Sequence, residues 1–363
     1  MTRQVLIVAP VIVPYDAISD AARTTCEIID GLEGTACHIL TLNCGIKDAR
    51  VRQIGSLMEL LNDSWFLDAD VLVYSYGLYN PLFQAMLLGN GKARQVVRFH
   101  NVTPEYLVPP KARKLIRKSL RQIHLFSQLD SIWADSRTNI DMLASQGVRT
   151  DHARVVPLVV DTAYRTLPPY TPPETAQILF LGRFVHSKGV LDLLRALETV
   201  KAAGRVPFRL ILAGSQRYSD PCYLEQLRAA AARLGDAVDY RGEVTDEEKA
   251  ALFREAEIFA IPSYHEGFCV PAIEALAAGC VPVGYAAHNL PRIFNGFGRL
   301  VSPGDVGALA ATLEEVCAML TRPGTPRVFE LDRGPMTARD RDIALGNYLQ
   351  TFAMPTVRSI LAG

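Results

Sequence analysis

Short apolar strand candidates alternate with amphipathic helix candidates along this chain, and the alternation restarts half-way. In the first half, strands are predicted at residues 4–9, 36–42, 70–75, 95–99, 131–134 and 154–157. Helices are predicted at 19–32, 51–62, 80–89, 111–129 and 137–146. This alternation is typical of βαβ units with a mostly parallel sheet. The first half therefore predicts a doubly wound α/β domain.

A proline-rich segment separates the two halves. Five prolines fall within residues 157–175, which have little apolar periodicity, so we interpret the segment as an interdomain linker. Beyond it, strands are predicted at 178–181, 208–213, 238–240, 257–261 and 281–284, and helices at 188–203, 221–234, 246–254, 271–278 and 305–320. The sequence thus predicts two Rossmann-like domains, 1–160 and 177–336, joined by a linker at 161–176 and facing a cleft.

Composition narrows the class of protein. The 363 residues are 49% hydrophobic and 21% charged, which is typical of a folded chain and not of a disordered one. The 38 Lys and Arg residues balance 38 Asp and Glu residues, which argues against a general nucleic-acid binder. The seven cysteines are scattered and form no C-x-x-C pair, which argues against a disulfide framework and a zinc site. We expect a reducing, cytoplasmic compartment.

The amino terminus and the longest apolar runs bear on targeting. Residues 5–10 are apolar, but the stretch is short and no small-residue cleavage pattern follows, so we expect a first strand and not a signal peptide. No run reaches the ~18 apolar residues of a membrane span. We expect any membrane contact to be peripheral.

Two acids eight residues apart mark the most informative loop. Glu266 follows a predicted strand, and Glu274 falls in the first turns of the next predicted helix. Ligands bind at the carboxyl ends of strands in open α/β sheets. The amides of Gly267, Phe268, Cys269 and Val270 would bind an anion such as a diphosphate at the helix amino terminus. Carboxylates on either side would accept hydrogen bonds from hydroxyls, so the segment predicts a nucleotide-sugar site.

A second loop adds positive charge. Gly182 and Arg183 follow the first strand of the second half, and Lys188 comes five residues later, just before a helix. A glycine turn with two cations beside free amides makes a compact pocket for a diphosphate. Surface charge alone is the alternative interpretation of these two cations.

Both loops resemble motifs of the retaining glycosyltransferases of family 4, which have the two-domain GT-B fold. The acids match the E-x7-E signature and the cationic loop matches G-R-x(3-4)-K-G. The resemblance implies that Glu266 contacts the donor sugar, that Glu274 binds the ribose hydroxyls, and that Arg183 and Lys188 hold the donor diphosphate without a metal. The alternatives for the acids are a solvated loop residue and a helix acid that suits the dipole.

Weaker signals come from three other strand ends. Gly214 and Arg241 follow strands of the second half, where the resemblance places contacts to the nucleotide, although a plain turn explains each equally well. His100 closes a strand of the first half, and the resemblance implies that it orients the donor sugar. Asn101 and Glu105 are candidates for contacts to the acceptor.

The chain departs from the family pattern in two loops. Residues 14–19 lack the glycine pair that many members carry after the first strand. Residues 286–292 end in Arg292, where many members have a glycine-rich loop that ends in Glu. The second departure points to an unusual donor sugar, and both departures keep a catalytically silent binding protein among the alternatives.

A basic segment stands apart from these motifs. Residues 111–121 hold six cations together with several apolar side chains. Such a helix can lie on an anionic membrane and meet a lipid-linked acceptor. We favour the other interpretation, in which its apolar side packs on the domain core.

The resemblance implies a metal-independent, retaining glycosyltransferase without a cofactor, which uses a UDP- or GDP-linked hexose and a saccharide or lipid-linked acceptor. Alternatives are another GT-B activity, such as a phosphorylase or nucleotide-sugar epimerase, and a silent sugar-nucleotide-binding scaffold. A final helix in 337–363 is predicted to cross back to the first domain.

Overall fold

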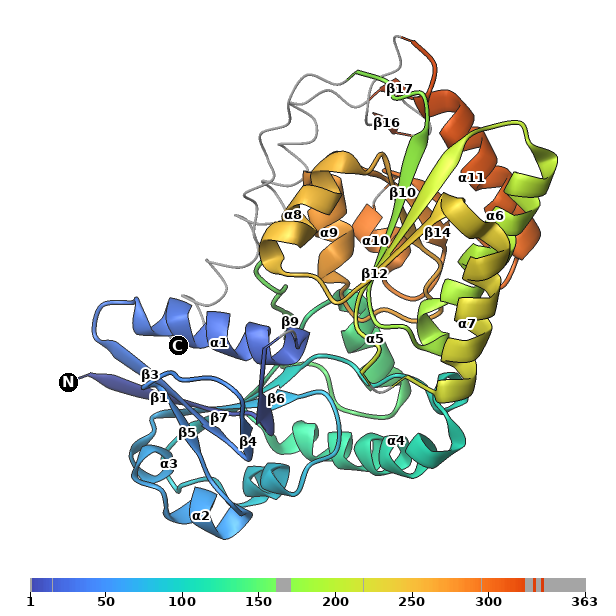
Figure 1. The fold of residues 1–363 in the computed structure, drawn as a ribbon. Helices are drawn as coiled ribbons and strands as arrows, with labels where there is room; N and C mark the ends of the chain where they lie inside the picture. Colours follow the sequence, from blue (N-terminus) through green and yellow to red (C-terminus); the bar gives the residue numbers. More distant parts are fainter. Residues whose placement is uncertain are drawn as a thin grey trace. The chain divides into compact units, whose positions relative to one another are not determined.

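The computed structural model describes residues 2–14, 16–160, 171–217, 219–294, 296–323, 329–330 and 334–335. Apart from residues 107–109, the described chain up to Val159 forms one compact unit, and the described chain from Val160 forms the other. Figure 1 shows the α/β organisation within each unit. The helix predicted for 337–363 and most of the predicted linker lie outside the described residues.

The first unit is built on a seven-stranded parallel sheet with the order β5-β3-β1-β6-β7-β8-β9. Its strands are β1 (Arg3–Val8), β3 (Thr35–Thr41), β5 (Val51–Gln53), β6 (Val71–Tyr76), β7 (Arg94–Phe99), β8 (Ser131–Ala134) and β9 (Ala153–Val155), and a separate short pair joins β2 (Val11–Ile12) to β4 (Asn43–Cys44). The helices are α1 (Ala17–Asp30), α2 (Leu57–Asn62), α3 (Ser64–Asp68), α4 (Pro110–Gln122) and α5 (Arg137–Ser145), with 3-10 turns η1 (Pro81–Leu87), η2 (Glu105–Leu107) and η3 (Ile123–Gln128).

Alternation along β1 explains how helices cover the sheet. Val5 and Ile7 join a buried cluster with Ala22 and Ile29 of α1. Successive strand side chains point to opposite faces, so Leu6 and Val8, which are also buried, face the other layer. Every residue of the central strand β6 is buried, as expected for a strand covered on both faces.

Two predicted helices of the first unit differ from the observed elements. The helix predicted over 51–62 begins as the edge strand β5, and its helical part is α2, which starts only at Leu57. Residues 51–53 pair with β3 because they follow a chain reversal that brings them to the open sheet edge. The segment predicted over 80–89 is the 3-10 turn η1, which begins at Pro81.

The second unit is built on a six-stranded parallel sheet with the order β12-β11-β10-β13-β14-β15. Its strands are β10 (Ala176–Leu181), β11 (Phe208–Ala213), β12 (Val238–Gly242), β13 (Ile258–Ile261), β14 (Val281–Tyr285) and β15 (Arg299–Val301). The helices are α6 (Val190–Ala203), α7 (Pro221–Leu234), α8 (Asp246–Glu255), α9 (Val270–Ala277), α10 (Leu290–Phe294) and α11 (Val306–Leu320), with turns η5 (His186–Lys188) and η6 (Gly235–Ala237); a short pair joins β16 (Phe329–Glu330) to β17 (Gly334–Pro335).

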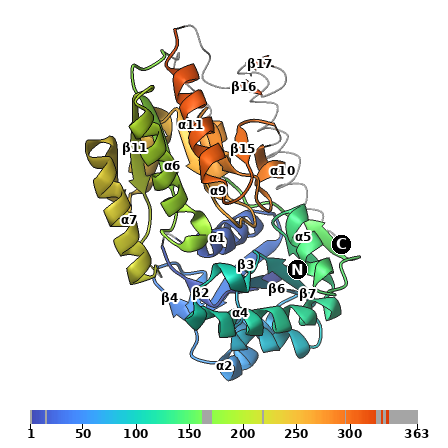
Figure 2. The same cartoon turned by 90° about the vertical axis from the view of Figure 1, so that its right-hand side faces the viewer.

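Helices cover both faces of this second sheet. In Figures 1 and 2, α6 lies beside α11 and α7, and it packs against both. Ile178 and Phe180 of β10 belong to the core cluster formed with these three helices. Helices α8 and α9 contact strands β10, β13 and β14 from the other face. The α10 and β15 elements were not predicted, because each is too short to show a period.

Candidate functional site

The candidate residues of the second unit lie at one edge of its sheet. Parallel strands β10, β11, β13 and β14 all end there, and the loops that follow carry Arg183, Gly214, Glu266 and His288. This is the edge at which open α/β sheets bind ligands.

The cationic loop after β10 is fixed to its neighbours by backbone hydrogen bonds. The Phe184 amide donates to the Ser215 carbonyl at 2.9 Å, and the Tyr264 amide donates to the Ser187 carbonyl at 2.9 Å. The Phe184 side chain is fully buried and anchors the turn. The loop after β10 is therefore held against the loops after β11 and β13.

Lys188 and Glu266 come together at this edge. The Lys188 ammonium lies 2.5 Å from Glu266 Oε1, and their side chains are 18% and 8% exposed. A buried carboxylate requires such a partner, because an unpaired buried charge is costly. The interpretation of Glu266 as a solvated loop acid is therefore wrong.

Arg183 contrasts with Lys188. Its side chain is exposed, and among the described residues no group forms a hydrogen bond or ion pair with its guanidinium. Five donors in a fixed fork are thus presented from the same loop that carries Lys188. This arginine is available to an anion.

The loop that leads into α9 has an unusual backbone at Cys269. Cys269 has φ 73° and precedes the helix, which starts at Val270. Phe268 is buried and Gly267 is partly exposed. Burial raises the pKa of the Cys269 thiol well above its usual range, and the nearby Glu266 charge adds to this shift. The thiol stays protonated, as expected for a residue that fills space instead of acting as a nucleophile.

Glu274 is the second acid of the pair, and it is 3% exposed. Its Oε1 lies 3.1 Å from the Lys249 ammonium of α8, which also reaches Asp246 at 3.3 Å. Glu274 is thus a buried acid of α9 that is paired with a lysine of α8, and its contact to a ribose stays a prediction. Lys249 was missed in the sequence, since its helix reads as an ordinary charged surface segment.

Two histidines complete this edge. The rings of His265 and His288 lie 4.0 Å apart, centroid to centroid. Nδ1 of His288 is 2.6 Å from the Glu266 carbonyl oxygen. Desolvation lowers the pKa of His288, and it lowers that of His265 to about 3, with the His288 and Lys188 charges adding to the latter shift. Both rings are therefore neutral at neutral pH.

The weaker candidates of this unit have structural partners. Gly214 has φ 139°, and a Cβ there would meet the Gly182 carbonyl oxygen at 1.8 Å, so only glycine lets these two strand ends approach. Arg241 donates to Asp239 at 2.8 Å across the surface of β12. Packing and surface pairing account for both residues, and their contacts to a nucleotide stay predictions.

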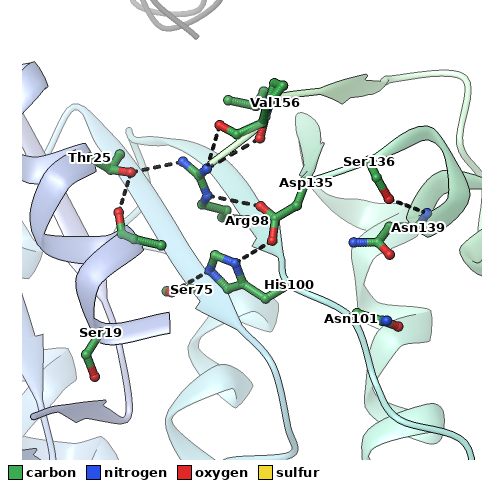
Figure 3. A network of polar contacts seen from close by, with 12 residues as sticks. Ser19, Thr25, Ser75, Arg98, His100, Asn101, Asp135, Ser136, Asn139 and Val156 are labelled. Carbon is green, nitrogen blue, oxygen red and sulfur yellow. Dashed lines mark hydrogen bonds and ion pairs between the residues drawn. The ribbon is translucent and has the colours of Figure 1, made fainter. Parts of the chain in front are cut away.

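His100 belongs to a buried network of the first unit (Figure 3). Its Nδ1 lies 2.8 Å from Asp135 Oδ2, its Nε2 lies 3.0 Å from Ser75 Oγ, and its side chain is 4% exposed. The carboxylate only accepts, so Nδ1 carries a hydrogen, and in the neutral ring Nε2 accepts from the Ser75 hydroxyl. Three adjacent strand ends thus fix the ring, whose role at a donor sugar stays a prediction.

Buried Arg98 compensates the Asp135 charge. Its Nε lies 3.5 Å from Asp135 Oδ1, while Nη1 donates to Thr25 Oγ1 at 2.9 Å (Figure 3). Desolvation lowers the pKa of Arg98, and the Asp135 charge opposes that shift. The other two candidates of this region differ: Asn101 has φ 98°, and Glu105 pairs at 3.3 Å with Arg117 of α4.

The basic segment forms helix α4. Its Ile116 is buried, as are Ile123 and Phe126 of the following turn, so the predicted packing of its apolar side is confirmed. The cations Lys114, Arg117 and Lys118 are exposed. Among the described residues, none of the helices has the length and apolar character needed to span a bilayer. The described ranges also contain no group of three or more His, Cys, Asp or Glu side chains placed to hold a metal ion.

Known proteins resemble the part of the chain that carries this site. Residues 169–319 match the family model described as glycosyl transferases group 1. The match covers both loops that hold the Lys188–Glu266 pair.

Two curated relatives are mannosyltransferases. The MMP alpha-(1->4)-mannosyltransferase of Mycolicibacterium hassiacum is 33% identical over 48% of this chain and 41% of its own length. The O-antigen chain mannosyltransferase B of Escherichia coli is 29% identical over 73% of this chain and 74% of its own length. The chain thus spans less than half of the first relative and about three quarters of the second.

Solved structures of glycosyltransferases share the fold. A glycosyltransferase from Rickettsia africae has a TM-score of 0.72 at 17% identity, with 99% of this chain and 97% of that chain covered. Anabaena Alr3699/HepE in complex with UDP-glucose has a TM-score of 0.72 at 16% identity, with 99% and 98% covered. The predicted GT-B fold is confirmed.

Proposed function

We propose that this chain is a retaining glycosyltransferase that moves a hexosyl group from a UDP- or GDP-linked sugar to a hydroxyl acceptor. The observation that carries the proposal is the Lys188–Glu266 pair, whose lysine shares its loop with Arg183, an exposed arginine without a partner among the described residues. The family match of residues 169–319 and the two mannosyltransferase relatives support it.

The cations suit the leaving diphosphate. The exposed Arg183 can form a bidentate contact, and Lys188 can exchange its carboxylate partner for a phosphate oxygen if sugar hydroxyls then donate to Glu266. Negative charge grows on the diphosphate as the glycosidic bond breaks, and two fixed cations stabilise that charge. These side chains supply locally the charge that a metal ion supplies in other transferases.

The acids suit the two ends of the donor. Exchange of the Lys188 partner releases Glu266 to accept hydrogen bonds from sugar hydroxyls. Glu274 lies further along the chain, in the first turns of α9, and its carboxylate is held by Lys249 of α8. We place the ribose hydroxyls there. The two carboxylates thus bracket the amino terminus of α9, which itself favours an anion.

Retention of configuration follows if the departing phosphate oxygen takes the acceptor proton on the side that the diphosphate leaves. In that step the acceptor oxygen forms the new bond to the anomeric carbon, and the donor bond to phosphate breaks. Arg183 and Lys188 stabilise the leaving group throughout. No covalent intermediate on the protein is required.

Incubation with a panel of nucleotide sugars tests the proposal. GDP-mannose comes first, because the two curated relatives are mannosyltransferases, and UDP-glucose follows. Release of the nucleoside diphosphate, with an α-linked product from an α-linked donor, is the expected result. Dependence on inorganic phosphate would favour a phosphorylase, a changed sugar on an intact nucleotide an epimerase, and binding without turnover a silent scaffold.

The surface of α4 bears on whether the acceptor is lipid-linked or a soluble saccharide. Exposed cations cover this helix. Tyr106, just before the helix, is 78% exposed, and Leu115, within it, is 38% exposed. Cations with exposed apolar side chains suit the interface of an anionic membrane. We propose a peripheral membrane contact here when the acceptor is lipid-linked, and no such contact when it is a soluble saccharide.

A further inference from the structure

His288 occupies a backbone conformation that favours glycine. It has φ 51°, in the loop between β14 and α10. Few residues other than glycine adopt it, although histidine does so more often than most, and such positions cluster at functional sites. Its contacts show what holds it.

The ring is fixed in one orientation and one tautomer. The carbonyl oxygen of Glu266 only accepts, so at 2.6 Å it receives a hydrogen from His288 Nδ1. The His265 ring packs on the other side, at 4.0 Å between centroids. Desolvation keeps the pKa of His288 below its usual range, so the ring stays neutral at neutral pH. A neutral ring with its hydrogen on Nδ1 presents a lone pair on Nε2.

No described residue donates a hydrogen bond to that lone pair. In the described ranges, the contacts of His288 are the Glu266 carbonyl and the His265 ring, and neither involves Nε2. The residue is half-buried, and Nε2 is not among the buried polar atoms that lack a partner, so solvent reaches this atom and a ligand group can replace that solvent. Phosphate and carboxylate oxygens carry no hydrogen to donate, whereas a hydroxyl does. Of the groups of a nucleotide sugar other than its base, the hydroxyls are the ones that can donate to Nε2.

We propose that His288 is a specificity residue, whose Nε2 accepts a hydrogen bond from a hydroxyl of the transferred sugar beside Glu266. This inference rests on the proposed function, since it takes the group next to Glu266 to be a sugar. It adds a contact that the E-x7-E motif does not contain. It also requires that the sugar carry a hydroxyl at that position, so the deoxy sugar is rejected.

Nuclear magnetic resonance of the full chain labelled with ¹⁵N-histidine tests the tautomer without any ligand. The chain has seven histidines, and H288G identifies the signal of His288. We expect a neutral ring at pH 7 with a hydrogen on Nδ1 and none on Nε2. An Nε2–H tautomer or an imidazolium at pH 7 would overturn the proposal.

Calorimetry with matched variants tests the contact. Glycine fits φ 51° without strain, so H288G removes the ring and leaves the loop in place, while H288N keeps an acceptor oxygen on a residue that tolerates this conformation. With H288G, the Kd for GDP and UDP should change less than twofold, and the Kd for GDP-mannose or UDP-glucose should rise about 3- to 12-fold, as loss of one neutral hydrogen bond predicts. H288N should recover part of that loss. H124G, at an exposed histidine of the first unit, is the control.

Deoxy donors show which hydroxyl is involved. Wild-type protein should discriminate against one deoxy analogue of its donor by at least about 10-fold, and H288G should lose this discrimination while keeping that against the other positions. Unchanged discrimination in H288G, or equal weakening of nucleotide and nucleotide sugar, overturns the role of His288. A wild-type protein that binds no nucleotide at all contradicts the proposed function instead, so the two failures are distinguishable.

Discussion

Lys188 combines two tasks at the scale of a single residue. Its ammonium compensates the buried Glu266 carboxylate at 2.5 Å, and the same loop carries the exposed Arg183. If the donor sugar binds to Glu266, the Lys188 ammonium can leave this carboxylate and bind the donor diphosphate instead. Lys188 can therefore stabilise the folded protein when no donor is bound, and it can stabilise the leaving diphosphate when the donor is bound.

Changing Lys188 to Ala should lower turnover by at least ~100-fold, because a charge partner of the transition state is lost. Steady-state release of nucleoside diphosphate measures this. The variant should also unfold more easily, since the Glu266 carboxylate is left buried without its partner. R233A, which breaks the exposed pair with Glu198, is the control and should leave turnover unchanged. Wild-type turnover in K188A would contradict the assignment.

Substitutions of Glu266 and Glu274 should affect different steps, namely sugar transfer and nucleotide binding. Glu274→Gln should weaken binding of the bare nucleoside diphosphate about 10-fold, because a hydrogen bond to a charged acceptor becomes a neutral one. Glu266→Gln should leave that affinity near the wild-type value and reduce transfer. Titration calorimetry with UDP and GDP, alongside turnover, measures both. Equal loss of nucleotide affinity in the two variants would count against the division of roles.

The residues of the site differed in how well the sequence predicted them. Glu266 and Lys188 stood out because each follows a strand beside a glycine turn, and strand ends gather at one edge of a parallel sheet. Their direct pairing was not predicted, because 78 positions separate them in sequence. His288 and Lys249 were missed, since neither belongs to a local pattern and each acquires its meaning from a contact that folding creates.

At the scale of elements, α4 presents charge on one side and packing on the other. Ile116 and Ser119 are buried, whereas Lys114, Arg117 and Lys118 are exposed. Arg117 is partly engaged by Glu105 at 3.3 Å, and Lys118 lies 5.0 Å from the Tyr79 ring centroid. An exposed ion pair of this kind contributes little, so these cations stay available to a surface.

If the acceptor is lipid-linked, the protein should bind anionic vesicles at low salt, because each cation contributes about 1 kcal/mol near such a surface. Binding should fade near physiological salt, where the Debye length is about 8 Å. Cosedimentation measures it. The triple change K114E/R117E/K118E should abolish binding without unfolding the protein.

The control spreads the same charge reversal over the first unit, as K47E/K92E/R149E at three exposed cations. This control should retain most of the vesicle binding. Wild-type protein that ignores anionic vesicles at low salt would make α4 an ordinary solvated face, and a soluble acceptor would follow.

Element type was predictable where the period was long and was not where the element was short. Helices α1, α6 and α7 show a helical period over 14 residues each, and all three were predicted. Strand β5 has only 3 residues and was read as part of a helix. A strand so short owes its form to the exposed edge of β3, which the sequence does not display.

At the scale of the whole chain, both sheets follow from repeated right-handed βαβ connections, which is why the α/β class could be predicted from alternation alone. The point at which the strand order reverses could not be predicted from the sequence. In the first sheet the reversal falls at β1, between β3 and β6, and in the second it falls at β10, between β11 and β13. Ligands bind at such reversal points in open sheets, and Gly182 and Arg183 follow β10 directly.

Nucleotide binding should stabilise one unit and not the other. The residues assigned to the nucleoside diphosphate, Arg183, Lys188 and Glu274, all lie in the second unit. Both tryptophans of the chain, Trp65 and Trp133, lie in the first. Tryptophan fluorescence therefore reports unfolding of the first unit alone, whereas calorimetry reports both.

A nucleoside diphosphate at 100 times its Kd stabilises the state that binds it by about 2.7 kcal/mol. We expect calorimetry to show one transition moving to higher temperature with added UDP or GDP, while the transition followed by tryptophan fluorescence stays in place. K188A should reduce the calorimetric shift, and R233A should retain it. If fluorescence and calorimetry shift together by the same amount, either the units unfold as one or the nucleotide contacts the first unit, and the assignment of its binding to the second unit alone is wrong.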